Sequence, residues 1–200
     1  FSDIERILSD MPESVNEIYQ DNTNVDEFEL GFINTVLEGK SRPGHFDGVA
    51  TIINKLFEIF RPQVVFFGEK DFQQTLVIRT LIDGFFPNII LVVCPTVRNK
   101  NGLALSSRNK LLSANSYKQC GIIFDCLLFA KENYLKIDYT DLLRKINIKI
   151  EKTNDFNLEY FEIRDEITLE HFGKSIDEGR FRGFIWVKVE GIRLIDNLLF

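Results

Sequence analysis

The chain has 200 residues, of which 44% are hydrophobic and 27% are charged, and its formal net charge is −6. This length and composition fit one large folded domain or two small ones, and they exclude a disordered or low-complexity chain. No run approaches the roughly 18 apolar residues of a membrane-spanning helix. An acidic chain also lacks the broad cationic face of a general nucleic-acid-binding protein. We therefore expect a soluble globular protein that binds neither a membrane nor nucleic acid.

The first part of the chain predicts three elements. Residues 2–9 have the pattern of a helix end with Ser2 as N-cap, and residues 25–36 alternate loosely, as in a strand or hairpin. Apolar residues then recur at helical spacing over 46–60, which predicts an amphipathic helix that stops before Pro62.

Two short apolar runs follow, each bounded by glycine or proline. Residues 64–67 and 89–93 have the character of strands buried on both faces of a parallel sheet, and the spacing over 70–84 predicts a helix between them. Helix, strand, helix and strand in this order predict an α/β fold with a doubly wound parallel sheet.

The pattern changes after Pro95. Helices are expected over 114–133 and 138–153, and three strand-like runs come after them (157–163, 181–189 and 192–198). Helices followed by mostly antiparallel strands predict a separate, smaller α+β domain. We therefore expect one domain over 1–96 and a second over 97–200.

Charge is distributed unevenly along the chain. Residues 1–39 hold one basic and ten acidic side chains, whereas residues 40–110 hold ten basic and five acidic ones. A cationic middle within an acidic chain indicates a localised anion-binding site, the alternative being basic residues scattered by chance. The three cysteines (Cys94, Cys120 and Cys126) lack metal-site spacing, which favours buried thiols in a reducing cytoplasm.

The first candidate site is the strand-to-helix turn Gly68-Glu69-Lys70-Asp71. A helix N-terminus offers unpaired N–H groups, glycine permits a ligand to approach closely, and the Lys70 ammonium can reach a phosphate. Open α/β sheets bind ligands at this end of their strands. A turn glycine beside a surface lysine is the alternative. Of the two residues that follow, Gln73 and Gln74, one is expected to face the crevice and the other to face outward.

A second candidate site is Leu105-Ser106-Ser107-Arg108-Asn109. Two hydroxyls and a guanidinium together can hold a triphosphate, and the arginine charge can match the charge that develops as a phosphate leaves. Gly102 precedes them and permits a loop that closes over the ligand. A serine-rich turn that only caps the next helix is the alternative.

The third candidate site is the turn from Ser41 to Phe46, which delivers Arg42 and His45 just before a helix. Both a ligand-binding role and a structural capping role stay open for His45. The other histidine, His171, lies in a plain amphipathic context, which favours a structural role.

Six stretches, taken together, are more specific than any one of them: Leu37-Glu38-Gly39, SRPGHFDGV from Ser41, FGEKDFQQ from Phe67, PTVR from Pro95, GLALSSRN from Gly102 and RLIDN from Arg193. In order and spacing they resemble the pantothenate synthetase (pantoate–β-alanine ligase) family over nearly the whole chain. The resemblance implies a Rossmann-like, nucleotidyltransferase-type parallel sheet domain, incomplete at its N-terminus, followed by a smaller α+β lid domain.

The resemblance implies a two-step ligation, in which ATP and (R)-pantoate form pantoyl adenylate and pyrophosphate, and β-alanine then displaces AMP to give pantothenate. It implies substrate binding by Gln74, Arg42 and His45, with Mg²⁺ accompanying ATP in a cytoplasmic homodimer. It also implies catalytic roles for Lys70, Ser106 and Arg108. The implied ATP-binding residues are Gly68, Glu69, Lys70, Asp71, Val97, Leu105, Ser106, Ser107 and Arg108. Metal-binding residues stay unassigned.

Two features of the family have no match in this sequence. These are the N-terminal HxGH-like motif that grips the ATP phosphates and an early glutamine that contacts pantoate and β-alanine. His45 and His171 are the only histidines, and neither stands in such a motif. We therefore expect weak or no ligase activity from this chain alone. A related enzyme that transfers AMP to another acceptor, or a non-catalytic remnant, is the alternative.

Overall fold

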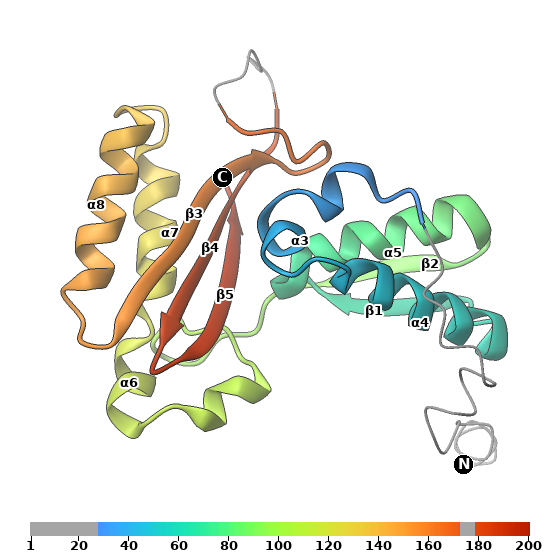
Figure 1. The fold of residues 1–200 in the computed structure, drawn as a ribbon, viewed down its shortest axis with the longest axis horizontal. Coiled ribbons are helices and arrows are strands. Elements are labelled where there is room, and N and C mark those ends of the chain that lie inside the picture. Colours follow the sequence, from blue (N-terminus) through green and yellow to red (C-terminus); the bar gives the residue numbers. More distant parts are fainter. Residues whose placement is uncertain (1–27, 173–178) are drawn as a thin grey trace.

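The computed structural model describes residues 28–172 and 179–200. Within them, a two-stranded parallel sheet and a three-stranded antiparallel sheet each pack against helices (Figure 1). The prediction of a parallel α/β part followed by a smaller α+β part is confirmed. The helix predicted over residues 2–9 lies outside the described residues. None of the described helices is long and apolar enough to cross a membrane.

The parallel sheet consists of β1 (Val64–Gly68) and β2 (Ile90–Cys94), with α4 (His45–Phe60) before β1 and α5 (Phe72–Phe85) after it. A short 3₁₀ helix, η2 (Glu69–Asp71), joins β1 to α5. The elements therefore form where the apolar spacing predicts them. One face of the sheet packs on both helices through a single apolar cluster that includes Phe57, Val65, Phe67, Ile78, Ile82, Ile89 and Leu91.

The opposite face of β1 and β2 corrects one expectation, because these strands are not buried on both sides. Phe66 is 67% exposed and Ile90 is 60% exposed, and both lie on the face that points away from α4 and α5. Within residues 28–172 and 179–200, nothing covers this face. The sequence correctly indicates strands that are apolar on both faces, but only one of the two faces is packed in this structure.

The strand or hairpin expected over residues 25–36 is wrong for the part that the structure describes. That part contains a 3₁₀ helix, η1 (Gly31–Asn34), followed directly by α3 (Leu37–Ser41). The main-chain groups of this segment pair with the amide of Gln73 on α5, as described below, and not with a neighbouring strand. A partner so distant in the sequence leaves no local periodicity to detect.

The antiparallel sheet has the strand order β3-β4-β5, where β3 is Phe156–Asp165, β4 is Phe181–Val189 and β5 is Ile192–Leu199. Helices α7 (Ile122–Asn133) and α8 (Tyr139–Glu151) cover one face of this sheet, as Figure 1 shows. Their core contains Leu127, Ile146, Ile150, Phe161 and Ile185, all at most 2% exposed.

The single helix predicted over 114–133 is interrupted, because two residues separate the end of α6 (Ala114–Gln119) from the start of α7 at Ile122. The break lies at Gly121, where a Cβ atom would approach the carbonyl oxygen of Asn101 to 2.1 Å. A glycine is therefore required where the loop crosses the helix.

The two sheets meet through a small apolar cluster. Phe184 of β4 and Tyr160 of β3 contact Leu37 of α3 and Phe72 and Leu76 of α5. This junction positions the carboxyl end of β1 against the strands of the second part of the chain, and the candidate site lies there.

Two of the three cysteines, Cys120 and Cys126, are buried as expected, whereas Cys94 is only half-buried. Cys94, Cys120 and Cys126 are free thiols, and burial raises the pKa of both Cys120 and Cys126 to about 12. The ring of His171 contacts the carbonyl oxygen of Phe172 at 2.8 Å and meets the ring of Tyr139 edge-on.

Candidate active site

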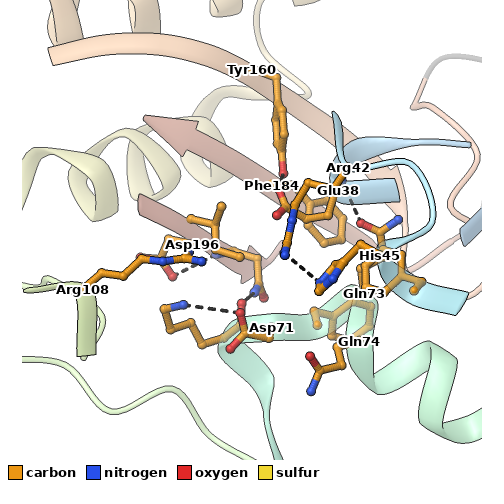
Figure 2. A pocket seen from close by; sticks show the side chains of 15 residues that line it. Glu38, Arg42, His45, Asp71, Gln73, Gln74, Arg108, Tyr160, Phe184 and Asp196 are labelled. Atoms are coloured by element: carbon orange, nitrogen blue, oxygen red, sulfur yellow. Dashed lines mark hydrogen bonds and ion pairs between the residues drawn. The ribbon is translucent and has the colours of Figure 1, made fainter. Parts of the chain in front are cut away.

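A cavity of about 270 Å³ lies between the two sheets, at the carboxyl end of β1. Both parts of the chain contribute to its wall. Its lining residues are Glu38, Arg42, His45, Phe46, Lys70, Asp71, Phe72, Gln73, Gln74, Arg108, Tyr160, Phe184, Ile195, Asp196 and Asn197. Figure 2 shows Arg108 entering from one side and Arg42 with His45 from the other. All three sequence motifs therefore reach one site.

Lys70 and Arg108 share this cavity although they lie on different 3₁₀ helices, η2 and η3 (Ser107–Leu111). The Lys70 side chain is 16% exposed, and its Nζ lies 3.5 Å from Oδ1 of Asp71. Arg108 makes a long hydrogen bond of 3.5 Å to the carbonyl oxygen of Arg193. The anion-site interpretation requires the two cations to converge, and they do.

Ser106 caps η3, as the structural alternative for its motif predicted. Its Oγ accepts from the N–H of Arg108 at 3.3 Å, and its own N–H donates to Oδ1 of Asn109 at 2.6 Å. Ser106 also lines a smaller hollow of about 10 Å³, together with Lys70. The cap thus fixes Arg108 and Ser106 relative to each other at the edge of the main cavity.

Six of the nine predicted ATP-binding residues do not line the main cavity: Gly68, Glu69, Val97, Leu105, Ser106 and Ser107. The Glu69 carboxylate turns away and pairs with Arg182 at 2.9 Å. Val97 and Leu105 are largely exposed, and the carbonyl oxygen of Val97 accepts from the Leu105 N–H at 2.9 Å. The structure therefore does not bring these six residues into the wall of the main cavity.

Gly68 ends β1 in an extended conformation, with φ −78°. A Cβ at this position would meet nothing within 4 Å. The backbone therefore does not require glycine there, and only the close approach of a ligand would. Asp71, the last residue of the motif, lines the cavity.

Arg42 and His45 form a pair at the far side of the cavity. Nη1 of Arg42 lies 2.7 Å from Nε2 of His45. Burial, followed by the charge of Arg42, lowers the pKa of His45, so the ring is neutral and accepts the hydrogen bond. Burial and the charge of Arg193 lower the pKa of Arg42. Within the described part of the chain, no carboxylate lies within ion-pair distance of Arg42.

Gln73 and Gln74 divide between structure and site. Gln73 is 4% exposed, its Oε1 accepts from the N–H of Glu38 at 3.0 Å, and its Nε2 donates to the carbonyl oxygens of Ile33 (2.7 Å) and Val36 (2.9 Å). Gln74 lines the cavity, and its amide hydrogen-bonds to no described residue. Both glutamines line the cavity, but the Gln73 amide is held by main-chain groups in the interior and does not point outward as expected, whereas the Gln74 amide has no such partner among the described residues.

Sequence reasoning missed the polar wall opposite Lys70. Glu38 forms an ion pair with Arg193 and accepts a 2.7 Å hydrogen bond from the Tyr160 hydroxyl. The guanidinium of Arg193 stacks on Trp186, 4.0 Å from the ring centroid. Burial and the adjacent Glu38 carboxylate raise the pKa of Tyr160 well above its usual value, so the phenol stays protonated.

Asp196 forms the floor of the cavity and pairs with Arg98 in bidentate fashion at 2.5 and 2.9 Å. Burial raises its pKa, against the opposing effect of Arg98. The Leu37-Glu38-Gly39 and RLIDN stretches were the sequence signals for this wall. Nothing in the sequence pairs Glu38 with Tyr160, because 122 positions separate them.

The comparisons with known proteins agree with this geometry. The family model described as pantoate-beta-alanine ligase matches residues 11–199. The chain is 42% identical over 187 residues to a pantothenate synthetase from Azobacteroides pseudotrichonymphae, and 40% identical over 185 residues to one from Flavobacterium psychrophilum. These alignments cover 94% and 92% of the chain. The chain spans 66%, just under two thirds, of the length of each relative.

Solved structures give the same result. A pantothenate synthetase from Thermus thermophilus superposes with a TM-score of 0.81 at 35% identity, covering 92% of this chain and 67% of that one. A pantoate-beta-alanine ligase from Francisella tularensis, complexed with beta-gamma ATP and beta-alanine, superposes with a TM-score of 0.61 at 32% identity, covering 92% of this chain and 61% of that one.

Proposed function

The chain belongs to the pantoate–β-alanine ligase family, and from this premise we propose that it serves the ATP-dependent ligation of (R)-pantoate and β-alanine to pantothenate. We propose that the reaction proceeds through pantoyl adenylate and releases pyrophosphate and AMP. The observation that carries the proposal is the convergence of Lys70, Arg108 and Arg42 on one cavity at the carboxyl end of β1.

Lys70 and Arg108 are proposed to bind the ATP polyphosphate. Adenylation needs the α-phosphorus held in line with a carboxylate while charge develops on the departing pyrophosphate, and cations already in place stabilise that charge. The hydroxyls of Ser106 and Ser107 lie beside Arg108 in the sequence and would bind phosphate oxygens. Of the other proposed ATP contacts, Gly68 and Asp71 serve the ribose and phosphates, and the main chain of Val97 serves the adenine. Glu69 and Leu105 are proposed as further ATP-binding residues, without a more specific role.

Gln74, Arg42 and His45 are proposed to bind pantoate at the other side of the cavity. Arg42 has no carboxylate partner among the described residues, and a substrate carboxylate would supply one. The amide of Gln74 can donate to and accept from the pantoate hydroxyls. Neutral His45 would hold Arg42 in place, since its Nε2 accepts from the guanidinium.

Mg²⁺ is proposed to arrive bound to the phosphates of ATP. Across residues 28–172 and 179–200, no group of three or more histidine, cysteine, aspartate or glutamate side chains is arranged to hold a metal ion. Magnesium sites that use substrate phosphates need only one or two carboxylates. Asp71, which lines the cavity, is the protein ligand that such a site would use.

We propose that this chain alone binds ATP but has weak or no ligase activity. The support is that the sequence holds no HxGH-like motif and that one face of the parallel sheet is uncovered within the described residues. Isothermal titration with ATP, and AMP formation in the presence of pantoate and β-alanine, test the two halves of this statement. ATP binding with little AMP is expected. Full turnover contradicts the second half, and absence of any ATP binding contradicts the first.

The same titration distinguishes the two alternatives. A related enzyme with another acceptor would form AMP with a different amine or acid from a substrate panel, whereas a non-catalytic remnant would bind neither ATP nor a pantoyl-adenylate mimic.

We further propose a cytoplasmic homodimer, divided into domains over 1–96 and 97–200. The family relationship supports the dimer, and light scattering measures it. The change from a parallel to an antiparallel sheet after β2 supports the boundary.

A further inference from the structure

The turn that carries Lys70 is held by β5, a strand from the other half of the chain. Nδ2 of Asn197 donates to the main-chain carbonyl oxygens of Glu69 and Lys70, each at 2.9 Å. One side chain therefore fixes both peptide groups on either side of the Lys70 Cα atom. Figure 1 shows β5 passing close to the end of β1, where this contact forms.

Arg182 of β4 orients the Asn197 amide. Its Nη1 donates to Oδ1 of Asn197 at 2.5 Å and to the Glu69 carboxylate at 2.9 Å. Because a guanidinium only donates, the amide oxygen must face Arg182, and the NH₂ group must face the two carbonyls. The orientation of Asn197 is therefore set by its neighbours.

Arg182 is itself immobilised. Its side chain is 4% exposed, its Nη2 pairs with Glu166 at 3.2 Å, and its guanidinium stacks 4.0 Å above the ring of Phe72. The neighbouring Asp196 accepts from the Asn197 N–H at 2.8 Å and is held by Arg98. The two side chains that contact the Lys70 turn, Asn197 and Arg182, are therefore themselves held in place on the antiparallel sheet.

We propose that Asn197 and Arg182 are positioning residues for Lys70. They fix the main chain of η2 and so keep the Lys70 ammonium in the cavity that Arg108 also lines. This inference rests on the proposed function, in which Lys70 binds the polyphosphate of ATP. A long lysine side chain on a three-residue 3₁₀ helix needs such support, because binding and catalytic geometry depend on displacements of about 1 Å.

The test is the affinity of this chain for ATP after Asn197→Ala. We expect the dissociation constant to rise about tenfold, the effect of losing roughly 1.4 kcal/mol of binding. Asn133→Ala is the matched control, because Nδ2 of Asn133 also donates to a main-chain carbonyl, that of Phe129 at 2.8 Å, but does so on α7 and away from the cavity wall. The control is expected to bind ATP within about twofold of the parent chain.

A double-mutant cycle with Lys70→Ala separates positioning from a general structural effect. If Asn197 acts through Lys70, Asn197→Ala changes the ATP dissociation constant less than about twofold once the lysine is absent. An equal loss in both backgrounds overturns the proposal, as does parent-like affinity in Asn197→Ala. Should that variant fail to fold, Asn197→Asp replaces it, since this substitution keeps the acceptor for Arg182 and removes the donor to the carbonyls.

Amide hydrogen exchange of the unligated chain keeps this inference distinct from the proposed function. Faster exchange over residues 68–72 in Asn197→Ala than in Asn133→Ala supports positioning, and equal exchange overturns it. If the parent chain does not bind ATP, the proposed function fails for this chain, while the exchange comparison still decides whether Asn197 holds the turn.

Discussion

Replacing Gln73 by leucine should destabilise the protein strongly, whereas the same change at Gln74 should not. The Gln73 amide makes three hydrogen bonds to the main chain of η1 and α3, and it is 4% exposed. At about 1 kcal/mol for each neutral hydrogen bond, leucine should lower the free energy of unfolding by about 3 kcal/mol. Leucine has a similar size, so loss of packing contributes little to this difference.

Urea denaturation followed by far-ultraviolet circular dichroism and by the fluorescence of Trp186 measures this effect. For a slope of about 2 kcal/mol per molar urea, the midpoint should fall by about 1.5 M in Gln73→Leu. Gln74→Leu is the control, because its amide hydrogen-bonds to no described residue, and its midpoint should move by less than about 0.3 M.

Ligand binding should show the reverse pattern. Gln74 lines the cavity where pantoate is proposed to bind, so Gln74→Leu should weaken the binding of a pantoyl-adenylate mimic while stability is kept. If Gln73→Leu unfolds at the same urea concentration as the parent chain, or if both variants lose equal stability, the division of roles between the two glutamines is refuted.

Three further predictions concern the cations, a buried glycine and a half-buried phenol. Lys70→Ala and Arg108→Ala should each weaken ATP binding at least about tenfold in titration calorimetry, as expected for the loss of a charge-assisted contact to phosphate. Lys110→Ala is the control, because Lys110 is exposed, and its affinity for ATP should not change. Equal affinity in all three variants would reject the phosphate roles. Gly39→Ala should lower thermal stability by several degrees, because the new Cβ would lie 2.2 Å from the carbonyl oxygen of Ile33; an unchanged melting temperature would contradict this packing. Burial raises the pKa of Tyr139 to about 12. Between about pH 10 and 12 the folded state therefore keeps the phenol proton, while the unfolded state releases it. Because the unfolded state binds fewer protons, the free energy of unfolding should fall over that range. Tyr139→Phe should make that fall shallower by about 1.4 kcal/mol per pH unit in urea titrations, and equal slopes would show that Tyr139 does not titrate as argued.

The parts of the site that sequence reasoning anticipated all lie in continuous stretches. The turn after β1, the SSR stretch and the RPGH stretch are each local, and each sends at least one side chain into the same cavity. Lys70 and Arg108, both expected to bind ATP, line the same cavity. The expectation for residues 25–36 was wrong because the partner of that segment, Gln73, acts from more than thirty positions away.

The sequence alone determined most of the helices and strands after residue 45 and the short motifs that carry positive charge, because apolar periodicity and helix-end chemistry act over a few residues. Only the tertiary structure decided that Glu38 meets Tyr160 and Arg193, and that Asn197 holds the turn of Lys70. Those contacts join α3 and η2 to strands more than a hundred positions later. They depend on how two sheets pack, and no short-range pattern encodes that packing.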